Sequence, residues 1–203
     1  MKKTLVIGLV LLLSISMLAG CSGGGGSGNS TGGGTQSTEK PGETAKTEQA
    51  PAGVKGETHS AENVSALVPE GWQAFPFYSG GAESPNTFSV HKGALNAMDI
   101  WSTPGVQIQF FPDGSGFGSN IKKDMYRDVS DLANQKLGDY TWEGFTGLSK
   151  NTKDEYVVPF AIFWTDAGSD KIQVTVWLEL GEETISLDDA DVQAILASIK
   201  PNK

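Results

Sequence analysis

Reactive side chains are few in this sequence of 203 residues. Cys21 is the only cysteine, and the only histidines are His59 and His91. Nucleophilic catalysis needs a base beside the nucleophile, and the chain contains no Gly-x-Ser-x-Gly motif that would present a reactive serine. We expect His59 near a linker and His91 on a strand, where an isolated histidine usually has a structural role. The sequence therefore predicts no catalytic residues, and we expect a protein that is not an enzyme.

The residues that precede Cys21 have the composition of a secretory signal. A basic start at residues 1–3 is followed by an apolar run over residues 5–19. The run is too short to span a bilayer comfortably, which favours a cleaved signal peptide over a retained transmembrane helix. Export would place the mature chain outside the cytoplasm.

The end of this segment, Leu18-Ala19-Gly20-Cys21, resembles the lipobox of bacterial lipoproteins. In that family the cysteine thiol receives a diacylglyceryl group, and a dedicated peptidase cuts before the cysteine. The resemblance implies that residues 1–20 are a lipoprotein signal peptide and that the acyl chains on Cys21, palmitate for example, bind the membrane. Two chains, at about 0.8 kcal/mol per buried CH₂, hold a protein stably. An ordinary signal peptide with a nearby cysteine is the alternative.

A polar segment follows the cysteine. Residues 22–53 consist of Gly, Ser, Thr, Glu, Lys, Gln and Pro with almost no apolar side chain, and such a composition cannot offset its own ordering entropy. We predict that residues 21–53 are a lipidated cysteine and a flexible linker with a root-mean-square span of about 30 Å. The start at Cys21 is similar to lipoproteins of Gram-positive bacteria, which are anchored on the outer face of the cell membrane; Ser22 also permits sorting to an outer membrane.

Residues 54–203 are long enough for one globular domain with a core. They contain 21 Asp and Glu against 11 Lys and Arg, a formal net charge of −10. An acidic surface repels nucleic acid and anionic lipid, so we expect neither as a partner of the domain.

Strands are predicted where apolar residues occupy every second position. The clearest are residues 171–180 and 106–111. Their opposite faces carry Gln107, Gln109, Gln173, Thr175, Trp177 and Glu179. Further strands are predicted at residues 64–68, 72–78, 87–91, 140–148 and 156–165. Pro159 places the last of these at a sheet edge or a bulge, because proline cannot donate to the ladder.

Two helices are predicted from apolar residues at helical spacing. The first covers residues 121–136, with the stripe Ile121, Met125, Val129 and Leu132. The second lies near the C-terminus, with the stripe Val192, Ile195, Leu196 and Ile199. Ser186 and Asp189 form a predicted capping box for it, and Pro201 ends it. An antiparallel β-sheet with two main helices packed on it is an α+β fold.

Short motifs at the two ends of the domain resemble the PsbP-like family. They are Val68-Pro69-Glu70-Gly71-Trp72 and Ile195-Leu196-Ala197-Ser198-Ile199. The resemblance implies an α/β/α sandwich around an antiparallel sheet, and a binding or accessory role rather than catalysis. No functional residue is carried over from it, and a turn followed by a core tryptophan also explains the first motif.

Three further patterns could bind a cofactor or an ion. Gly114, Gly116 and Gly118 give Gly-x-Gly-x-Gly, not the Gly-x-Gly-x-x-Gly of dinucleotide-binding folds, so we expect no cofactor; an anion at the following helix start is the alternative. Acidic residues, Glu182, Glu183, Asp188, Asp189 and Asp191, could offer oxygen ligands to Ca²⁺, but they also suit a helix start. No set of Cys and His suits zinc, and we predict no metal site.

Tryptophans supply the candidate ligand contacts. The five are Trp72, Trp101, Trp142, Trp164 and Trp177. Most should lie in the core, whereas Trp177 is predicted on a polar face; we select Trp177 and Trp101 as candidate ligand-binding residues.

Two function classes follow from these observations. The first is a lipid-anchored domain that binds a protein or a cell-envelope ligand without catalysis. The second is an envelope hydrolase or carbohydrate-active enzyme that uses two carboxylates among Asp99, Asp113 and Glu143. A transporter's solute-binding protein fits less well, because such proteins usually have two lobes.

Overall fold

The computed structural model describes residues 53–119 and 121–202. These residues fall within one compact unit, Thr44–Lys203. No helix among them is long and apolar enough to cross a membrane.

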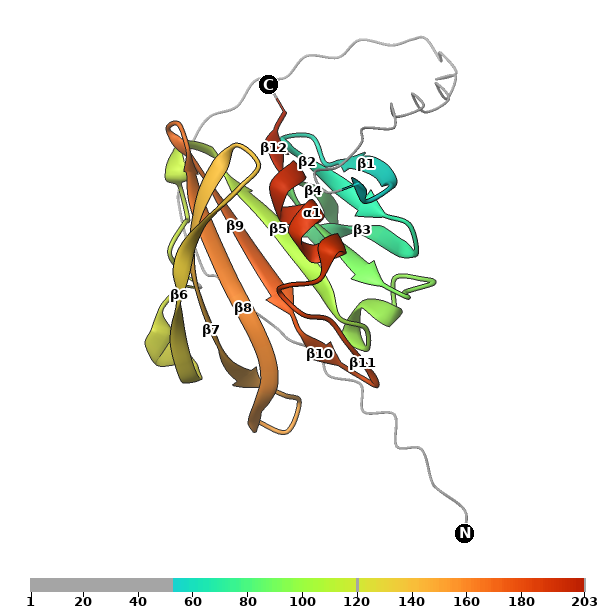
Figure 1. The fold of residues 1–203 in the computed structure, drawn as a ribbon, viewed down its shortest axis with the longest axis vertical. Coiled ribbons are helices and arrows are strands. Elements are labelled where there is room, and N and C mark those ends of the chain that lie inside the picture. The colour runs from blue at the N-terminus through green and yellow to red at the C-terminus, as the bar shows by residue number, and fades with distance from the viewer. Residues whose placement is uncertain (1–52, 120, 203) are drawn as a thin grey trace, which may run out of the picture. The chain divides into compact units, whose positions relative to one another are not determined.

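The main element is a seven-stranded antiparallel sheet (Figure 1). Its strand order is β3-β4-β5-β9-β8-β7-β6, so the last strand of the series along the chain, β9, lies in the middle next to β5. The strands are β3 (Trp72–Ser79), β4 (Ala82–Lys92), β5 (Gly105–Phe111), β6 (Arg127–Leu137), β7 (Tyr140–Lys150), β8 (Tyr156–Ala167) and β9 (Asp170–Trp177).

A three-stranded sheet and a short hairpin complete the strands. The small sheet has the order β1-β2-β12, formed by β1 (Gly56–Ser60), β2 (Val64–Pro69) and β12 (Lys200–Pro201). The hairpin consists of β10 (Glu179–Leu180) and β11 (Glu183–Thr184). Three short 3₁₀ helices lie in loops: η2 (Asp99–Trp101), η3 (Pro112–Gly114) and η4 (Lys123–Met125).

The helix α1 (Ala190–Ser198) packs on one face of the large sheet, beside β2 of the small sheet (Figure 1). The predicted apolar stripe of this helix is confirmed, since Val192, Ile195, Leu196 and Ile199 are all at most 1% exposed. The stripe joins the apolar face of β5 and β9 in one buried cluster, which includes Val106, Ile108, Val174 and Val176. Burial of this cluster is the main source of stability expected for the domain.

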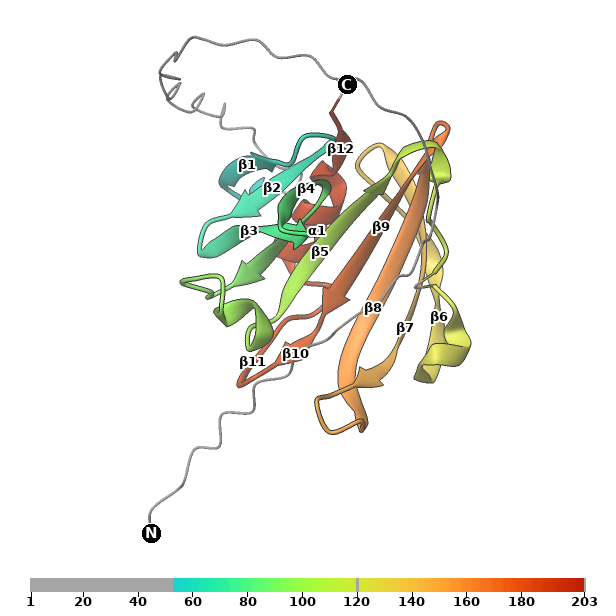
Figure 2. The ribbon, with the colours of Figure 1, turned by 180° about the vertical axis from the view of Figure 1, so that it is seen from behind.

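The predicted fold class is wrong, because the domain is mostly antiparallel β-sheet and does not have two main helices. In the described part of the chain α1 is the only α-helix. The α/β/α sandwich implied by the PsbP-like resemblance is therefore wrong as well: one α-helix covers one face of the large sheet, and the other face has no α-helix among the described residues (Figure 2).

The helix predicted over residues 121–136 is instead η4 followed by β6. Two β-bulges explain the error. Between Arg127 and Ser130, and again between Leu132 and Gln135, β6 has one residue more than its partner β7. Each extra residue shifts the alternation by one position, so Val129, Leu132 and Gln135 turn inward at intervals of three. This spacing imitates the period of a helix.

The predicted C-terminal helix is confirmed, with different ends. It begins at Ala190 and has Asp189 as its N-cap residue. The predicted pair does interact, since Ser186 N donates to Asp189 Oδ2 at 3.0 Å, but this contact closes the turn before the helix. Pro201 does not end the helix directly; it lies in β12.

All seven predicted strands are present, although Pro159 is not at a sheet edge. Its strand, β8, lies between β7 and β9. The β8–β9 ladder ends at the pair Phe160–Trp177, and Pro159 O then accepts a hydrogen bond of 3.1 Å from Leu178 N. Because Pro159 lies one residue beyond the last pair of the β8–β9 ladder, its missing N–H removes no hydrogen bond from that ladder.

Candidate binding face

The face of the large sheet opposite α1 carries amide, hydroxyl and aromatic side chains. Cross-strand pairs align them in three rows over β5, β9 and β8. Gly105, which pairs with Trp177, contributes no side chain to these rows. We call the other residues of the rows the amide–aromatic face: Gln107, Gln109, Phe160, Ile162, Trp164, Gln173, Thr175 and Trp177. The rows extend onto β4 through Thr87 and Ser89. None of these side chains is charged, in a domain whose formal net charge is −10; the row of Gln109, Gln173 and Trp164 ends beside Glu143 of β7, which pairs with Trp164.

Trp177 lies at a pocket of about 200 Å³ on this face. The pocket is lined by Gln107, Tyr126, Phe160, Ile162, Thr175 and Trp177. The structure therefore places the predicted residue Trp177 where a ring could contact a ligand, with amide and hydroxyl groups beside it. Pockets that combine apolar walls with a few polar groups are the usual form of ligand sites.

Contacts between rings hold the aromatic side of the pocket. The ring of Phe160 lies 4.5 Å from that of Tyr126 and 6.1 Å from that of Trp177, between centroids. Phe160 also packs edge-on against Phe145, and both are buried. Burial raises the pKa of the Tyr126 phenol. The lining is thus preorganised rather than assembled by the ligand.

Gln173 is a buried polar residue in the row next to the pocket. Its side chain is 1% exposed, and its Nε2 donates to Gln109 Oε1 at 3.3 Å. Its Oε1 has no hydrogen-bond partner among the described residues. With either orientation of the amide, one polar atom of Gln173 lacks a partner. Such a buried group is costly and rare; among the described side chains only Gln173 and His59 have one.

Trp101, the second predicted ligand-binding residue, does not line the pocket. It is 72% exposed and lies in η2, in the loop from Gly93 to Pro104 that leads into β5. Because Gly105 pairs with Trp177, Trp101 and Trp177 are near the same end of the sheet. Of the tryptophans predicted mostly to lie in the core, Trp72 and Trp142 are buried, whereas Trp164 is half-buried.

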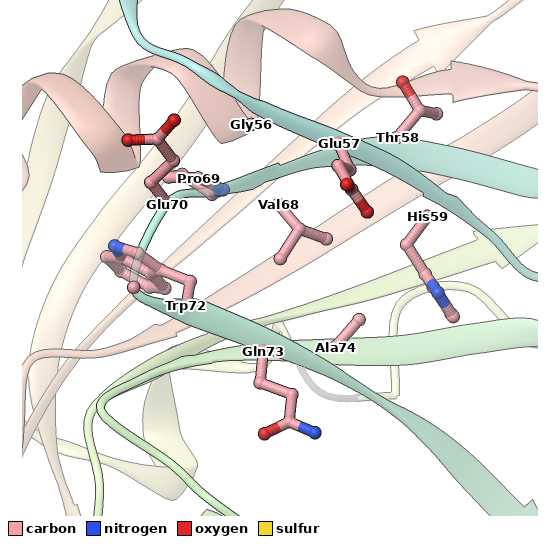
Figure 3. Close-up of a pocket in the computed structure, with 11 residues that line it drawn as sticks. Gly56, Glu57, Thr58, His59, Val68, Pro69, Glu70, Trp72, Gln73 and Ala74 are labelled. Carbon is pink, nitrogen blue, oxygen red and sulfur yellow. The ribbon is translucent and has the colours of Figure 1, made fainter. Parts of the chain in front are cut away.

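A second pocket, of about 450 Å³, lies between the small sheet and the edge strand β3 (Figure 3). Glu57 and His59 of β1, Val68 of β2 and Gln73 of β3 line it. His59 lies on β1, which begins three residues after the predicted linker ends at residue 53. Burial lowers its pKa, partly offset by Glu83, and its Nε2 has no partner among the described residues. Besides the hydroxyl of Thr58, the carboxylates of Glu57 and Glu70 line this pocket.

His91 lies on a strand, as predicted, and has a structural environment. It is 4% exposed, and its Nδ1 is 3.1 Å from the carbonyl oxygen of Thr103. Burial lowers its pKa, while the Thr103 carbonyl acts in the opposite direction. His91 thus secures the loop before β5.

The three carboxylates considered for hydrolysis are not brought together. Asp99 and Asp113 lie beyond opposite ends of β5, whose seven residues span about 20 Å. Glu143 lies on β7, three strands away from β5, which corresponds to about 14 Å. Glycoside hydrolysis requires a pair within roughly 5–10 Å, so these residues do not form one.

The other sequence patterns have structural roles. The Gly-x-Gly-x-Gly segment is followed by η4 and β6 rather than by an α-helix. A dinucleotide-binding turn and an anion site at a helix start both require an α-helix at that point, so this segment forms neither. Asp191 accepts a hydrogen bond from Trp72, and Asp189 from Ser186. In the described part of the chain no cluster of three or more His, Cys, Asp or Glu could hold a metal ion.

Sequence reasoning missed most of the pocket. The alternation in β5 and β9 did show that Gln107 and Thr175 share the polar face with Trp177. Tyr126 was missed because its segment was assigned to a helix. The lipobox residues Leu18, Ala19, Gly20 and Cys21 lie outside the described residues.

Comparisons with known proteins add little. No protein-family model matches the chain, and no curated protein matches it. Among solved structures, it is similar to a crystal structure from Bacteroides thetaiotaomicron VPI-5482, with 15% sequence identity and a TM-score of 0.36 over 79% of this chain. The aligned region covers 50% of that chain, so this protein spans about half of its length.

Proposed function

We propose that the protein is a lipid-anchored lipoprotein on the outer face of the cell membrane, and that its domain binds a protein or cell-envelope ligand without catalysis. The residues Leu18-Ala19-Gly20-Cys21 support the anchor, because they match the lipobox. Residues 22–53 then act as a tether of about 30 Å. The amide–aromatic face is the binding surface.

One observation carries the binding role: an uncharged row of amides and rings, with Trp177 at a pocket, on an otherwise acidic domain. Gln107 and Thr175 offer donors and acceptors, and Trp177 offers a flat apolar surface. A ligand that fits combines neutral polar groups with an apolar side.

Photo-crosslinking in the native host tests the binding role. A benzophenone amino acid replaces Gln107 at the pocket, and in a control protein it replaces Val157, which is 55% exposed and outside the pocket. We expect one reproducible adduct from position 107 and none of that mass from position 157. Adducts of equal yield from both positions, or none from position 107, contradict a binding site at the pocket.

Mass spectrometry of the protein from host membranes tests the anchor separately. The expected chain begins at Cys21 and carries the mass of a diacylglyceryl group. Residues 1–20 still attached, with a free thiol, would overturn the anchor and leave the pocket experiment intact.

A further inference from the structure

The loop from Gly93 to Pro104 presents three large apolar side chains to solvent. Leu95 is 83% exposed, Met98 71% and Trp101 72%. Single exposed apolar residues are common on protein surfaces, but three within seven positions of one loop are a local concentration. The loop lies beside the β10–β11 hairpin in both views (Figures 1 and 2).

The only charged side chain of this loop, that of Asp99, is bonded to the loop's own backbone. Asp99 Oδ2 accepts hydrogen bonds from Leu95 N at 2.8 Å, Asn96 N at 3.0 Å and Asn96 Nδ2 at 3.0 Å. The carbonyl oxygen of Asp99 accepts a further bond of 2.8 Å from Thr103 Oγ1. The carboxylate therefore serves to fix the turn, and the large exposed side chains of the loop are apolar. A loop held in this way loses little conformational entropy when it binds a surface.

The apolar tip is at the end of the domain from which the tether leaves. The described chain begins at Gly53, and the carbonyl oxygen of Lys55 accepts a hydrogen bond of 3.0 Å from Glu70 N. In the same turn the carbonyl oxygen of Gly71 accepts one of 3.2 Å from Gly93 N, the first residue of the loop. The start of the domain and the start of the loop are thus joined through two consecutive residues.

We propose that Leu95, Met98 and Trp101 dock the domain on the interface of a zwitterionic lipid bilayer. The proposal rests on the proposed lipid anchor, which keeps the loop close to the membrane. Indole rings favour the headgroup region, where one side is apolar and the other wet. Three side chains bind a bilayer weakly when free in solution, but a tether of about 30 Å supplies a local concentration in the millimolar range. Docking then orients the domain without any further attachment.

Acidic residues beside the loop define which lipids it accepts. A Cβ atom placed on Gly93 would lie 3.4 Å from both carboxylate oxygens of Glu183, and one placed on Gly181 would lie 2.3 Å from the carbonyl oxygen of Ser102. The hairpin with Glu182 and Glu183 therefore abuts the loop. Anionic headgroups would be repelled by these carboxylates and by the net charge of the domain. We expect docking on phosphatidylcholine to weaken when anionic phosphatidylglycerol is added.

The test uses the chain from Cys21 onward, coupled through its only thiol to a maleimide lipid in phosphatidylcholine vesicles. This artificial anchor makes the result independent of natural lipidation. Acyl chains brominated near the headgroup quench a tryptophan that enters the interface. We expect clear quenching of the tryptophan emission, reduced at least twofold in Trp101→Phe because the other four tryptophans lie outside this loop.

Matched variants separate docking from mere proximity. Leu95→Asn and Met98→Gln should each reduce the quenching, whereas Val157→Asn and Met125→Gln, which alter residues 55% and 51% exposed outside the loop, should leave it unchanged. Quenching that survives Trp101→Phe unchanged would overturn the proposal. The proposal would also be overturned if no quenching occurred and iodide reached Trp101 freely. The loop would then be a candidate binding site for a protein partner instead. A host protein without acyl chains would refute only the natural anchor.

Discussion

The indole Nε1 of Trp72 donates a hydrogen bond of 2.9 Å to Oδ2 of Asp191. Trp72 begins β3 at one edge of the large sheet, and Asp191 lies in the first turn of α1. The bond therefore ties the only α-helix of the described residues to the strand that borders the second pocket. The carboxylate at the helix start also interacts favourably with the unpaired N–H groups there.

Replacing Trp72 by Phe should lower the free energy of unfolding by about 2–3 kcal/mol. Hydrogen bonds to a charged acceptor contribute about 1.5–3 kcal/mol, and a smaller ring leaves part of the site unfilled. Trp142→Phe is the control, because that indole is also buried but donates to a neutral acceptor, Leu137 O, at 3.4 Å. Urea unfolding measures both; an equal or larger loss in Trp142→Phe would show that the bond to Asp191 adds nothing.

Gly138 is required where the β6–β7 turn meets α1. Its φ is +59°, and a Cβ atom there would lie 2.0 Å from the carbonyl oxygen of Ala197. We expect Gly138→Ala to lower the free energy of unfolding by about 3 kcal/mol or more, from the clash and the left-handed backbone together. Gly80→Ala isolates the backbone term, since Gly80 has φ +62° and no atom within 4 Å of its Cβ position; about 1 kcal/mol is expected there. Similar thermal unfolding of the two variants would contradict the close approach.

Alternation in the sequence was enough to locate six of the seven strands of the large sheet and the polar side of β5 and β9, because a half-buried strand must alternate. It could not locate β6, whose bulges place Val129 and Leu132 three residues apart. The sequence also did not predict the strand order, because β9 lies beside β5 through pairs of residues that are 60 to 72 positions apart, and local patterns do not record such pairs. For the site, Trp177 was found through its polar neighbours. The pocket itself was not predicted, because Tyr126 lines it from a segment that was predicted to be a helix.

The first bulge of β6 can be tested at Asp128. This residue has φ +50°, a conformation that costs a residue with a Cβ about 1–2 kcal/mol and glycine almost nothing. Ser130 lies two positions further along the same strand and is likewise exposed, but its φ is not positive. We expect Asp128→Gly to be more stable than Ser130→Gly by about 1–2 kcal/mol in urea unfolding. Equal losses in the two variants would argue against the bulge.

His91 should make stability depend on pH in a defined direction. Its pKa in the folded protein is lowered from 6.5, mainly by burial, with the Thr103 carbonyl acting in the opposite direction. Below pH 6.5 the unfolded chain therefore binds a proton that the folded chain does not, so stability is present above that pH and decreases as the pH falls toward the lowered pKa. Burial lowers the pKa of His59 as well, and the two effects have the same sign.

Comparison of the wild-type protein with His91→Gln between pH 8 and pH 5 isolates this contribution. Glutamine keeps a side-chain donor for the carbonyl oxygen of Thr103 but does not titrate. The difference in free energy of unfolding between the two proteins should therefore change by up to about 1.4 kcal/mol for each unit of pKa shift, in the direction of a relative gain for His91→Gln at low pH. Carboxylates common to both proteins cancel in this difference. A difference that stays constant across the range would mean that His91 is protonated equally in the folded and unfolded chains, and the loop before β5 would then not owe its stability to a neutral imidazole.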